Sequence, residues 1–146
     1  MREEDVGHCV DLGSRFHEHS YWNWLPYDKE KTYNWTMRGL ENRNKLLLVA
    51  EDAPSQKIFG FFIGKVTDFW FCDEIVAEEE VMFLSPENRG GTTALRFMRA
   101  WEWWAKDKGA SVMFFNPTSH GQGDKWDKFM KRLGFHKASA CYRKSI

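Results

Sequence analysis

The chain has 146 residues with 21 basic and 21 acidic side chains, so its formal net charge is zero. This balance provides no general attraction to nucleic acid or to an anionic membrane, and we expect neither as a partner. The apolar fraction of 42% argues against disorder, and the length favours one domain over residues 1–146.

The first part of the chain predicts two helices joined by an aromatic loop. Asp5 can cap a first helix, in which apolar residues recur at helical spacing to about His17. Residues 20–27 combine four aromatic side chains with Asn and Pro, which is typical of a loop. Asp28 can then cap a second helix that ends at about Asn42.

The middle of the chain predicts three strands that follow one another closely. They are expected over 46–51, 58–67 and 75–84, with a turn at 52–55 and an aromatic hairpin connection at 68–73. Two glycines in the second of these strands leave room for a close neighbour, and they are Gly60 and Gly64.

The last part predicts helices alternating with strands. A helix is expected over 92–108, with an apolar stripe and with Gly109 as its stop. A buried strand at 111–116 and a helix from 124 or 125 to 133 follow, and 136–146 can form one or two closing strands. This order of elements favours a mixed sheet with helices on both faces.

The heavy aromatic load and the cysteines also bear on function. Eight Trp and twelve Phe exceed what a core of this size requires, which suggests a ligand cleft or a subunit interface, so a homodimer is possible. The three cysteines have no paired spacing and form no zinc pattern, so we expect a reducing compartment and no metal. No apolar run follows the N-terminus, so a cytoplasmic protein without a secretory signal is expected.

The segment between the third strand and the long helix is the most informative. An apolar strand end leads through Pro86 into Arg89-Gly90-Gly91 and a helix start at Thr92. Such a junction presents unpaired backbone N–H groups and the helix dipole to an anion, which suggests a phosphate-bearing ligand. The alternative is a tight turn followed by N-cap threonines, with no ligand.

The run from Leu84 to Ala94 resembles a known signature, in which a strand is followed by x-Pro-x-x-Arg-Gly-x-Gly-x-Gly/Ala and then by a long helix. It is the signature of the GNAT superfamily of N-acetyltransferases, except that Thr92 stands here in place of the second glycine. Residues 102–110 and the Leu-Gly-Phe after the last helix also resemble that family. The chain looks similar to small, divergent members of phages and bacteria. The resemblance implies an α/β (α+β) domain with a mixed, mostly antiparallel central sheet and helices on both faces.

The same resemblance implies acetyl-CoA as cosubstrate and direct transfer of its acetyl group to an amine. It assigns the strand end and the glycine turn to the pantetheine and pyrophosphate, with two further residues on the opposite side. The implied cofactor-binding residues are Phe83, Leu84, Arg89, Gly90, Gly91, Thr92, Thr93, Ala94, Asn116 and Phe129.

Transfer to an amine needs a base and a proton donor for the leaving thiolate. Glu78 and Glu80 share one face of their strand by its period of two, so either can be the base, with Glu80 preferred. The alternative is a solvated strand edge. The family's tyrosine acid falls on Met130 here, so Tyr142 or solvent is expected to replace it.

The aromatic loop is the expected wall of the acceptor site, through Tyr21, Trp22 and Trp24. Aromatic faces beside acidic groups suit a cationic small-molecule or peptide amine. Packing on the domain or on a second subunit is the alternative, and it applies equally to 69–71. An alternative for the whole chain is a catalytically weak or silent protein of the same fold, with a structural or interaction role, that still binds CoA.

Overall fold

The computed structural model describes residues 1–116 and 123–138. Its helices and strands, with two short 3-10 turns at Glu3–Asp5 and Pro86–Asn88, are α1 (Val6–Glu18), α2 (Lys29–Glu41), β1 (Lys45–Asp52), β2 (Lys57–Asp68), β3 (Ile75–Leu84), α3 (Thr93–Asp107), β4 (Val112–Phe114) and α4 (Gly123–Arg132). These elements lie close to the predicted ranges, although β4 is shorter than expected.

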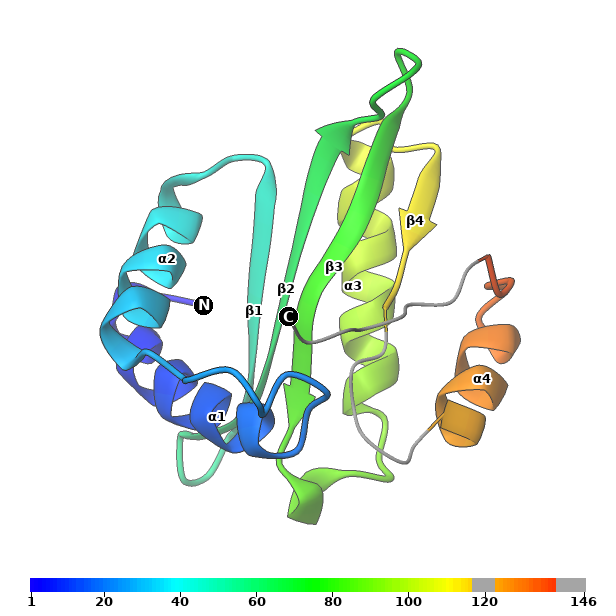
Figure 1. Cartoon of the computed structure of the whole chain (residues 1–146). Helices are drawn as coiled ribbons and strands as arrows, with labels where there is room; N and C mark the ends of the chain where they lie inside the picture. Colours follow the sequence, from blue (N-terminus) through cyan, green and yellow to red (C-terminus); the bar gives the residue numbers. More distant parts are fainter. Residues whose placement is uncertain (117–122, 139–146) are drawn as a thin grey trace.

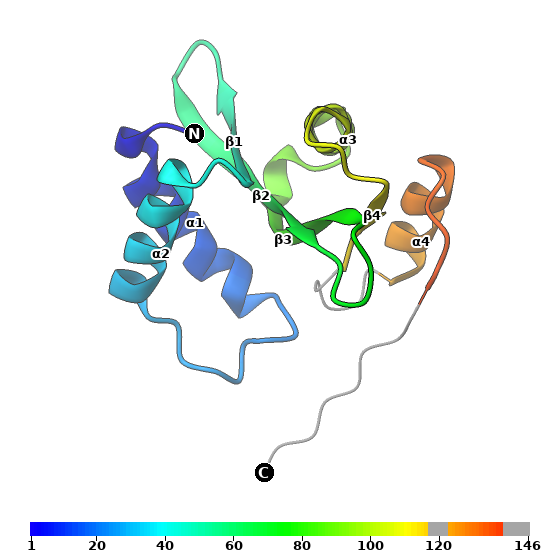
Figure 2. The same ribbon diagram turned by 90° about the horizontal axis from the view of Figure 1, so that it is seen from above.

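One mixed sheet organises the described part of the chain. Its strands run in the order β1-β2-β3-β4, with antiparallel pairing among the first three and parallel pairing of β3 with β4. Helices α1 and α2 cover one face and α3 covers the other, while α4 lies beyond β4 on the α3 side (Figures 1 and 2). The predicted fold, a mostly antiparallel mixed sheet with helices on both faces, is confirmed.

The alternation of side chains along β2 builds a core on each side of the sheet. Phe62 packs with Phe97 and Trp101 of α3, whereas its neighbours Phe61 and Ile63 pack on the opposite face, against α1. Each fully buried aromatic side chain of this kind stabilises the fold by about 2–3 kcal/mol. Both faces of the central strands are therefore fixed by packing.

The helix ends show why the helices begin and end where they do. Asp28 caps α2 by accepting a hydrogen bond from the Lys31 amide at 2.9 Å, as predicted. The predicted Asp5 cap of α1 is wrong, because the Asp5 carboxylate instead accepts from the Arg2 amide at 2.7 Å and makes no cap bond. Gly109 follows α3 at φ +80°, which confirms it as a stop, and Gly134 ends α4 in the same way at φ +85°.

The two glycines of β2 sit under close neighbours, as expected. A Cβ at Gly60 would lie 2.7 Å from the Phe83 carbonyl oxygen, and one at Gly64 would lie 2.9 Å from Trp101 Nε1. At the end of the chain, residues 136–138 form no strand, and the rest of the closing strands predicted for 136–146 falls outside the described residues. No helix in the described ranges is long and apolar enough to span a membrane.

A β-bulge interrupts the pairing of β2 with β3. Ile63 is opposite Val81, but the next residue, Gly64, is opposite Glu79, so Glu80 is an extra residue in β3. A bulge bends its strand, increases the local twist and leaves backbone groups unpaired. It therefore sets the orientation of the three consecutive glutamates.

Candidate active site

Strands β3 and β4 pair only briefly and then part. Their parallel pairing covers three positions and ends at Glu78 opposite Phe114. From there β3 continues to Leu84 without a partner on that side in the described part of the chain. Figure 1 shows β3 extending well past the end of β4. The result is a wedge in which an extended ligand can pair with exposed backbone groups of β3.

The loop from β3 to α3 closes one end of this wedge, and two arginines hold it in place. Arg89 Nε donates to the Leu84 carbonyl at 2.9 Å. Arg15 of α1 reaches Ser85 Oγ and Glu87 Oε2, each at 3.5 Å. Because the buried Ser85 and the strand end are tied in this way, the glycines that follow have a defined position.

The start of α3 has the properties of an anion-binding site. Gly90 adopts φ +90°, a conformation that favours glycine. Apart from their own chain neighbours, no atom of the described residues lies within 4 Å of where a Cβ of Gly90 or Gly91 would be. Thr92 is the N-cap residue but makes no side-chain cap bond, and the first turn holds no acidic residue. Helix geometry leaves the first amides of α3 free to bind an anion.

The structure therefore brings the predicted cofactor-binding residues together around the wedge. Phe83 and Leu84 end β3, and residues 89–94 form the glycine turn and the first turn of α3. The backbone N–H of Asn116, just after β4, donates to Glu79 Oε2 at 3.4 Å across the wedge. Phe129 lies on α4 and packs against the core on the α3 side of the sheet. Their contacts with a cofactor stay predictions.

The two glutamates predicted as bases are both paired with lysines. Glu80 Oε2 lies 2.8 Å from Lys45 Nζ, which also sits 4.0 Å from the centre of the Trp35 ring of α2. Glu78 Oε2 lies 3.0 Å from Lys65 Nζ. Since Lys45 and Lys65 are opposite each other on β1 and β2, both carboxylates lie on the face of the sheet that α1 and α2 cover.

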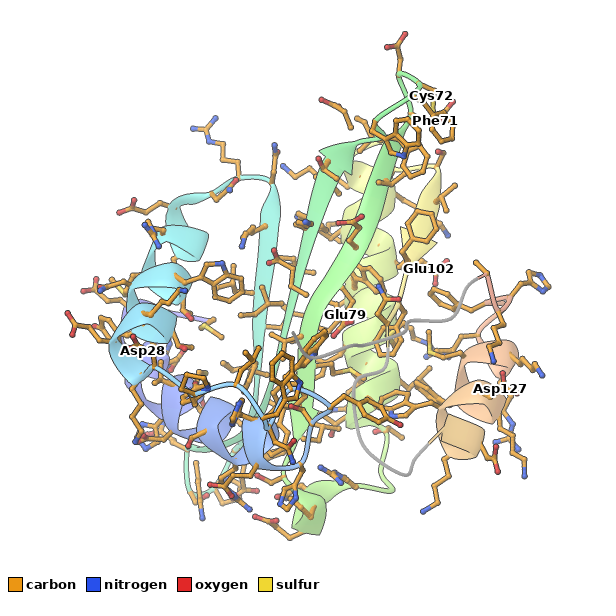
Figure 3. The ribbon with its side chains drawn as sticks, in the orientation of Figure 1. Asp28, Phe71, Cys72, Glu79, Glu102 and Asp127 are labelled. Atoms are coloured by element: carbon orange, nitrogen blue, oxygen red, sulfur yellow. The ribbon has the colours of Figure 1, made fainter. Side chains whose placement is uncertain are left out.

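The middle glutamate, Glu79, points to the other face and has no ammonium partner in the described part of the chain. Burial raises the pKa of its carboxyl to about 8 against the opposing effect of the Asn116 amide, and the Glu80 charge adds to the rise. Figure 3 labels Glu79 midway along β3, near the end of β4. A carboxyl with this pKa can accept a proton near neutral pH.

Sequence reasoning did not single out Glu79, although it lies between the two predicted bases. The pattern of three glutamates gave no way to tell which one faces the lysines, since that depends on the pairing partners on β1 and β2. The raised pKa depends on the wedge between β3 and β4, which has no signature in the sequence.

We expect Glu79→Gln to stabilise the protein at alkaline pH. Because the folded state binds this proton more tightly than the unfolded state, the carboxyl lowers stability as pH rises from about 4.5 to about 8, and the loss is complete above that. After a reduction for the partial exposure of the side chain, the free energy of unfolding of the variant should be higher by about 2 kcal/mol at pH 9 and nearly unchanged at pH 4. Chemical unfolding at both pH values measures the difference, and an equal change at both would contradict the burial argument.

The predicted proton donors occupy very different positions. Met130 of α4, at the place of the family's tyrosine, is buried in the core on the α3 side and offers no proton. Tyr142, the expected substitute, lies outside the described residues. The assignment of the acid therefore stays a prediction.

The aromatic loop between α1 and α2 presents its side chains at the surface. Tyr21, Trp22 and Trp24 are between 41% and 47% exposed, although Ser20, whose Oγ accepts from the Trp22 amide at 3.1 Å, is fully buried. The buried serine anchors the loop on the α1 and α2 side of the sheet (Figure 2). The loop therefore lies on the face of the sheet opposite the one to which Glu79 points, and its role as an acceptor wall stays a prediction.

The hairpin between β2 and β3 carries a second group of exposed aromatic side chains. Trp70 is 85% exposed and Phe71 is 65% exposed, and their rings pack edge to face. The hairpin projects beyond the rest of the sheet (Figure 1). Such a projection suits a contact between subunits, and a homodimer stays a prediction.

Comparisons with known proteins identify the fold. No protein-family model matches the sequence, and no curated protein matches it significantly. Solved structures match it along its whole length. An acetyltransferase from Trypanosoma brucei has a TM-score of 0.76 and 16% identity, covering 100% of this chain and 96% of its own. A transcriptional regulator from Bacillus halodurans C-125 has a TM-score of 0.80 and 16% identity over the same shares.

A third solved structure is similar and carries a ligand. AAC(6′)-Iy, in complex with a bisubstrate analogue that contains CoA, has a TM-score of 0.74 and 18% identity, covering 100% of this chain and 95% of its own. At these identities the likeness establishes the fold alone. The chain has the fold of the GNAT acetyltransferases, as the motif around the glycine turn implied.

Proposed function

We propose that this chain, which has the GNAT fold, is an N-acetyltransferase that moves an acetyl group from acetyl-CoA to an amine by direct attack. The observation that carries the proposal is the uncapped start of α3, with Gly90 and Gly91 open to a ligand, at the end of a wedge that also holds Glu79. An anion site at the end of β3 and a titratable carboxyl where β3 and β4 part would match the two ends of an acyl-CoA.

The residues present fit acetyl-CoA along this wedge. The amides of the glycine turn and of the first turn of α3 would hold the pyrophosphate, with the remaining guanidinium nitrogens of Arg89 beside them. The pantetheine would lie along the end of β3, at Phe83 and Leu84. Asn116 and Phe129 would border it on the other side. The acetyl group would then lie near Glu79.

In the proposed reaction, the ionised Glu79 carboxylate takes one proton from the acceptor's ammonium group. The neutral amine nitrogen attacks the thioester carbonyl carbon, so a C–N bond forms and the C–S bond breaks. The sulfur leaves with the bonding pair as a thiolate and takes a proton from Tyr142 or solvent, while the second amine proton is lost to solvent. A pKa of about 8 lets Glu79 accept a proton at near-neutral pH without being permanently protonated.

The acceptor we propose is a cationic amine on a small molecule or peptide. The exposed rings of Tyr21, Trp22 and Trp24 offer faces for cation–π contact. The similarity to AAC(6′)-Iy, whose bound bisubstrate analogue is CoA-S-monomethyl-acetylneamine, supports a small-molecule amine. Two free cysteines among the described residues, Cys9 and Cys72, agree with a cytoplasmic location.

A second candidate is a protein of the same fold that binds CoA but transfers acetyl groups poorly. Met130 favours it, because a buried thioether stands where the fold's usual donor would protonate the leaving thiolate. Under this proposal the wedge keeps its binding role and the projecting hairpin supplies an interaction surface.

Calorimetric titration with acetyl-CoA, followed by acetylation assays on panels of amines and peptides, separates the two candidates. We expect micromolar binding and turnover of at least one cationic amine. Binding without turnover of any acceptor would favour the second candidate. An absence of binding would exclude both.

A further inference from the structure

The hairpin between β2 and β3 exposes aromatic rings and carboxylates side by side. Trp70 and Phe71 are mostly exposed with their ring centres 4.7 Å apart, and Figure 3 labels Phe71 at the projecting end of the hairpin. The same turn has three exposed carboxylates without an ion-pair partner among the described residues, and they are Asp68, Asp73 and Glu74. The run 68–74 contains no basic residue, so this surface is apolar and negatively charged.

Contacts within the hairpin hold this surface in one shape. The Phe69 N–H donates to the Glu74 carbonyl at 2.8 Å and closes the turn. The Phe69 ring lies edge to face with Phe71 at 4.6 Å and stacks on Phe114 of β4 at 6.1 Å, both measured between ring centres. Because the turn is already ordered in this way, a partner that binds it loses little free energy to the ordering of the loop.

The outward face of α3 has a second exposed tryptophan beside charges of the opposite sign. Trp103 is 71% exposed, and the side chains that α3 buries lie on its other face, namely Phe97, Met98, Trp101 and Ala105. Arg96 and Arg99 precede Trp103 at helical spacing, so the three share the outward face. Both arginines are exposed, and neither forms an ion pair within the part of the chain that the structure describes. This face is therefore positively charged on the N-terminal side of Trp103.

The two surfaces complement each other in apolar character and in charge. Tryptophan and arginine contribute most to protein interfaces, and carboxylates pair with guanidinium groups in a two-bond geometry. Within one chain the surfaces do not meet, because the hairpin extends past the end of α3 (Figure 1). A second copy of the chain supplies both complements at once, since a two-fold axis gives the hairpin of each copy the α3 of the other.

We propose that the chain forms a two-fold dimer in which the hairpin of each copy packs on the outward face of α3 in the other copy. In this contact Trp70 and Phe71 lie against the partner subunit's Trp103. Asp68 and Asp73 lie toward the partner subunit's Arg99. The proposal names the surfaces of the homodimer that the aromatic load of the sequence suggests, and it does not depend on the proposed acetyl transfer.

Sedimentation velocity over a wide range of protein concentrations at low salt tests the interface. We expect the natural protein to dimerise as its concentration rises. Reversal of charge on the hairpin, by Asp68→Lys together with Asp73→Lys, should raise the dimer dissociation constant by about 100-fold, because the dimer contains the contact twice. Arg99→Glu on α3 should have a similar effect. Arg99 is the better choice than Arg96, which lies closer to the proposed pyrophosphate site.

A mixture of the hairpin variant with Arg99→Glu shows whether the two surfaces bind each other. In the mixed dimer the reversed hairpin meets the reversed helix and the natural hairpin meets the natural helix, so both contacts are attractive again. We expect the mixture to dimerise about as tightly as the natural protein, and high salt to weaken the natural dimer. The control is Arg38→Glu, at an exposed arginine of α2 without an ion pair among the described residues, and it should change nothing.

The outcomes separate this interface from the proposed function. A natural protein that stays monomeric at every concentration excludes a second copy as the occupant, even if it transfers acetyl groups. A dimer that either charge reversal leaves intact, or a mixture that stays monomeric, also overturns the proposal. A dimer that follows the expected pattern without any acetyl transfer supports the interface and contradicts the function. If the hairpin variant does not fold, Arg99→Glu and Trp103→Ser decide, because each of them must weaken the dimer.

Discussion

Glu79→Gln is expected to lower kcat by about 100-fold or more while acetyl-CoA binds with unchanged affinity. A positioned general base contributes about 10²–10⁴ to the rate, and glutamine cannot accept the proton. The amide oxygen of glutamine can still accept from the Asn116 amide, so the wedge should keep its shape. Steady-state rates on the best acceptor, together with calorimetry on acetyl-CoA, measure the two effects separately.

The neighbouring glutamates are matched controls for this variant. Glu78→Gln and Glu80→Gln remove the same charge from the same strand but break the ion pairs with Lys65 and Lys45. We expect them to keep most of the rate. The rate of the natural protein should rise with pH through about 8, and only Glu79→Gln should lose that inflection. If Glu80→Gln or Glu78→Gln instead removes it, the base is the residue that the sequence alone favoured.

The glycine turn shows how much of the site the sequence predicts. Strand, Pro86, Arg89-Gly90-Gly91 and helix follow one another within a dozen residues, so local conformation alone brings the anion site together. The structure added that Arg89 uses its Nε for the Leu84 carbonyl and that Thr92 makes no cap bond. These contacts depend on side-chain rotamers that no spacing rule specifies.

The glutamates and Trp101 show what sequence reasoning missed. The shared face of Glu78 and Glu80 followed from the period of a strand, but their lysine partners come from β1 and β2. The sequence predicted an apolar stripe on the long helix, but the close packing of the Trp101 indole against Gly64 depends on which part of β2 lies beneath that helix. These contacts depend on pairing between strands that are distant in the sequence and on a β-bulge. Neither feature can be predicted from a short stretch of sequence.

Gly91→Val is expected to weaken acetyl-CoA binding by about 100-fold, with Gly91→Ala intermediate. Among the residues that the structure describes, none beyond the chain neighbours has an atom within 4 Å of a Cβ at this position, and the backbone here is not in the left-handed region, so the fold should accept either side chain. The added carbons would occupy the space proposed for the pyrophosphate and separate it from the amides of α3. Losing one or two charge-assisted hydrogen bonds accounts for a loss of this size.

Two controls test whether Gly91→Val weakens binding through the pyrophosphate alone. Gly7→Val adds the same side chain at another glycine with nothing within 4 Å, on α1, and should leave the affinity unchanged. S-acetylpantetheine contains the thioester arm without the pyrophosphate, so the natural protein and Gly91→Val should use it equally well. If its use falls as much as that of acetyl-CoA, the valine has disturbed the wedge itself. If acetyl-CoA binds Gly91→Val normally, the pyrophosphate does not lie at the start of α3.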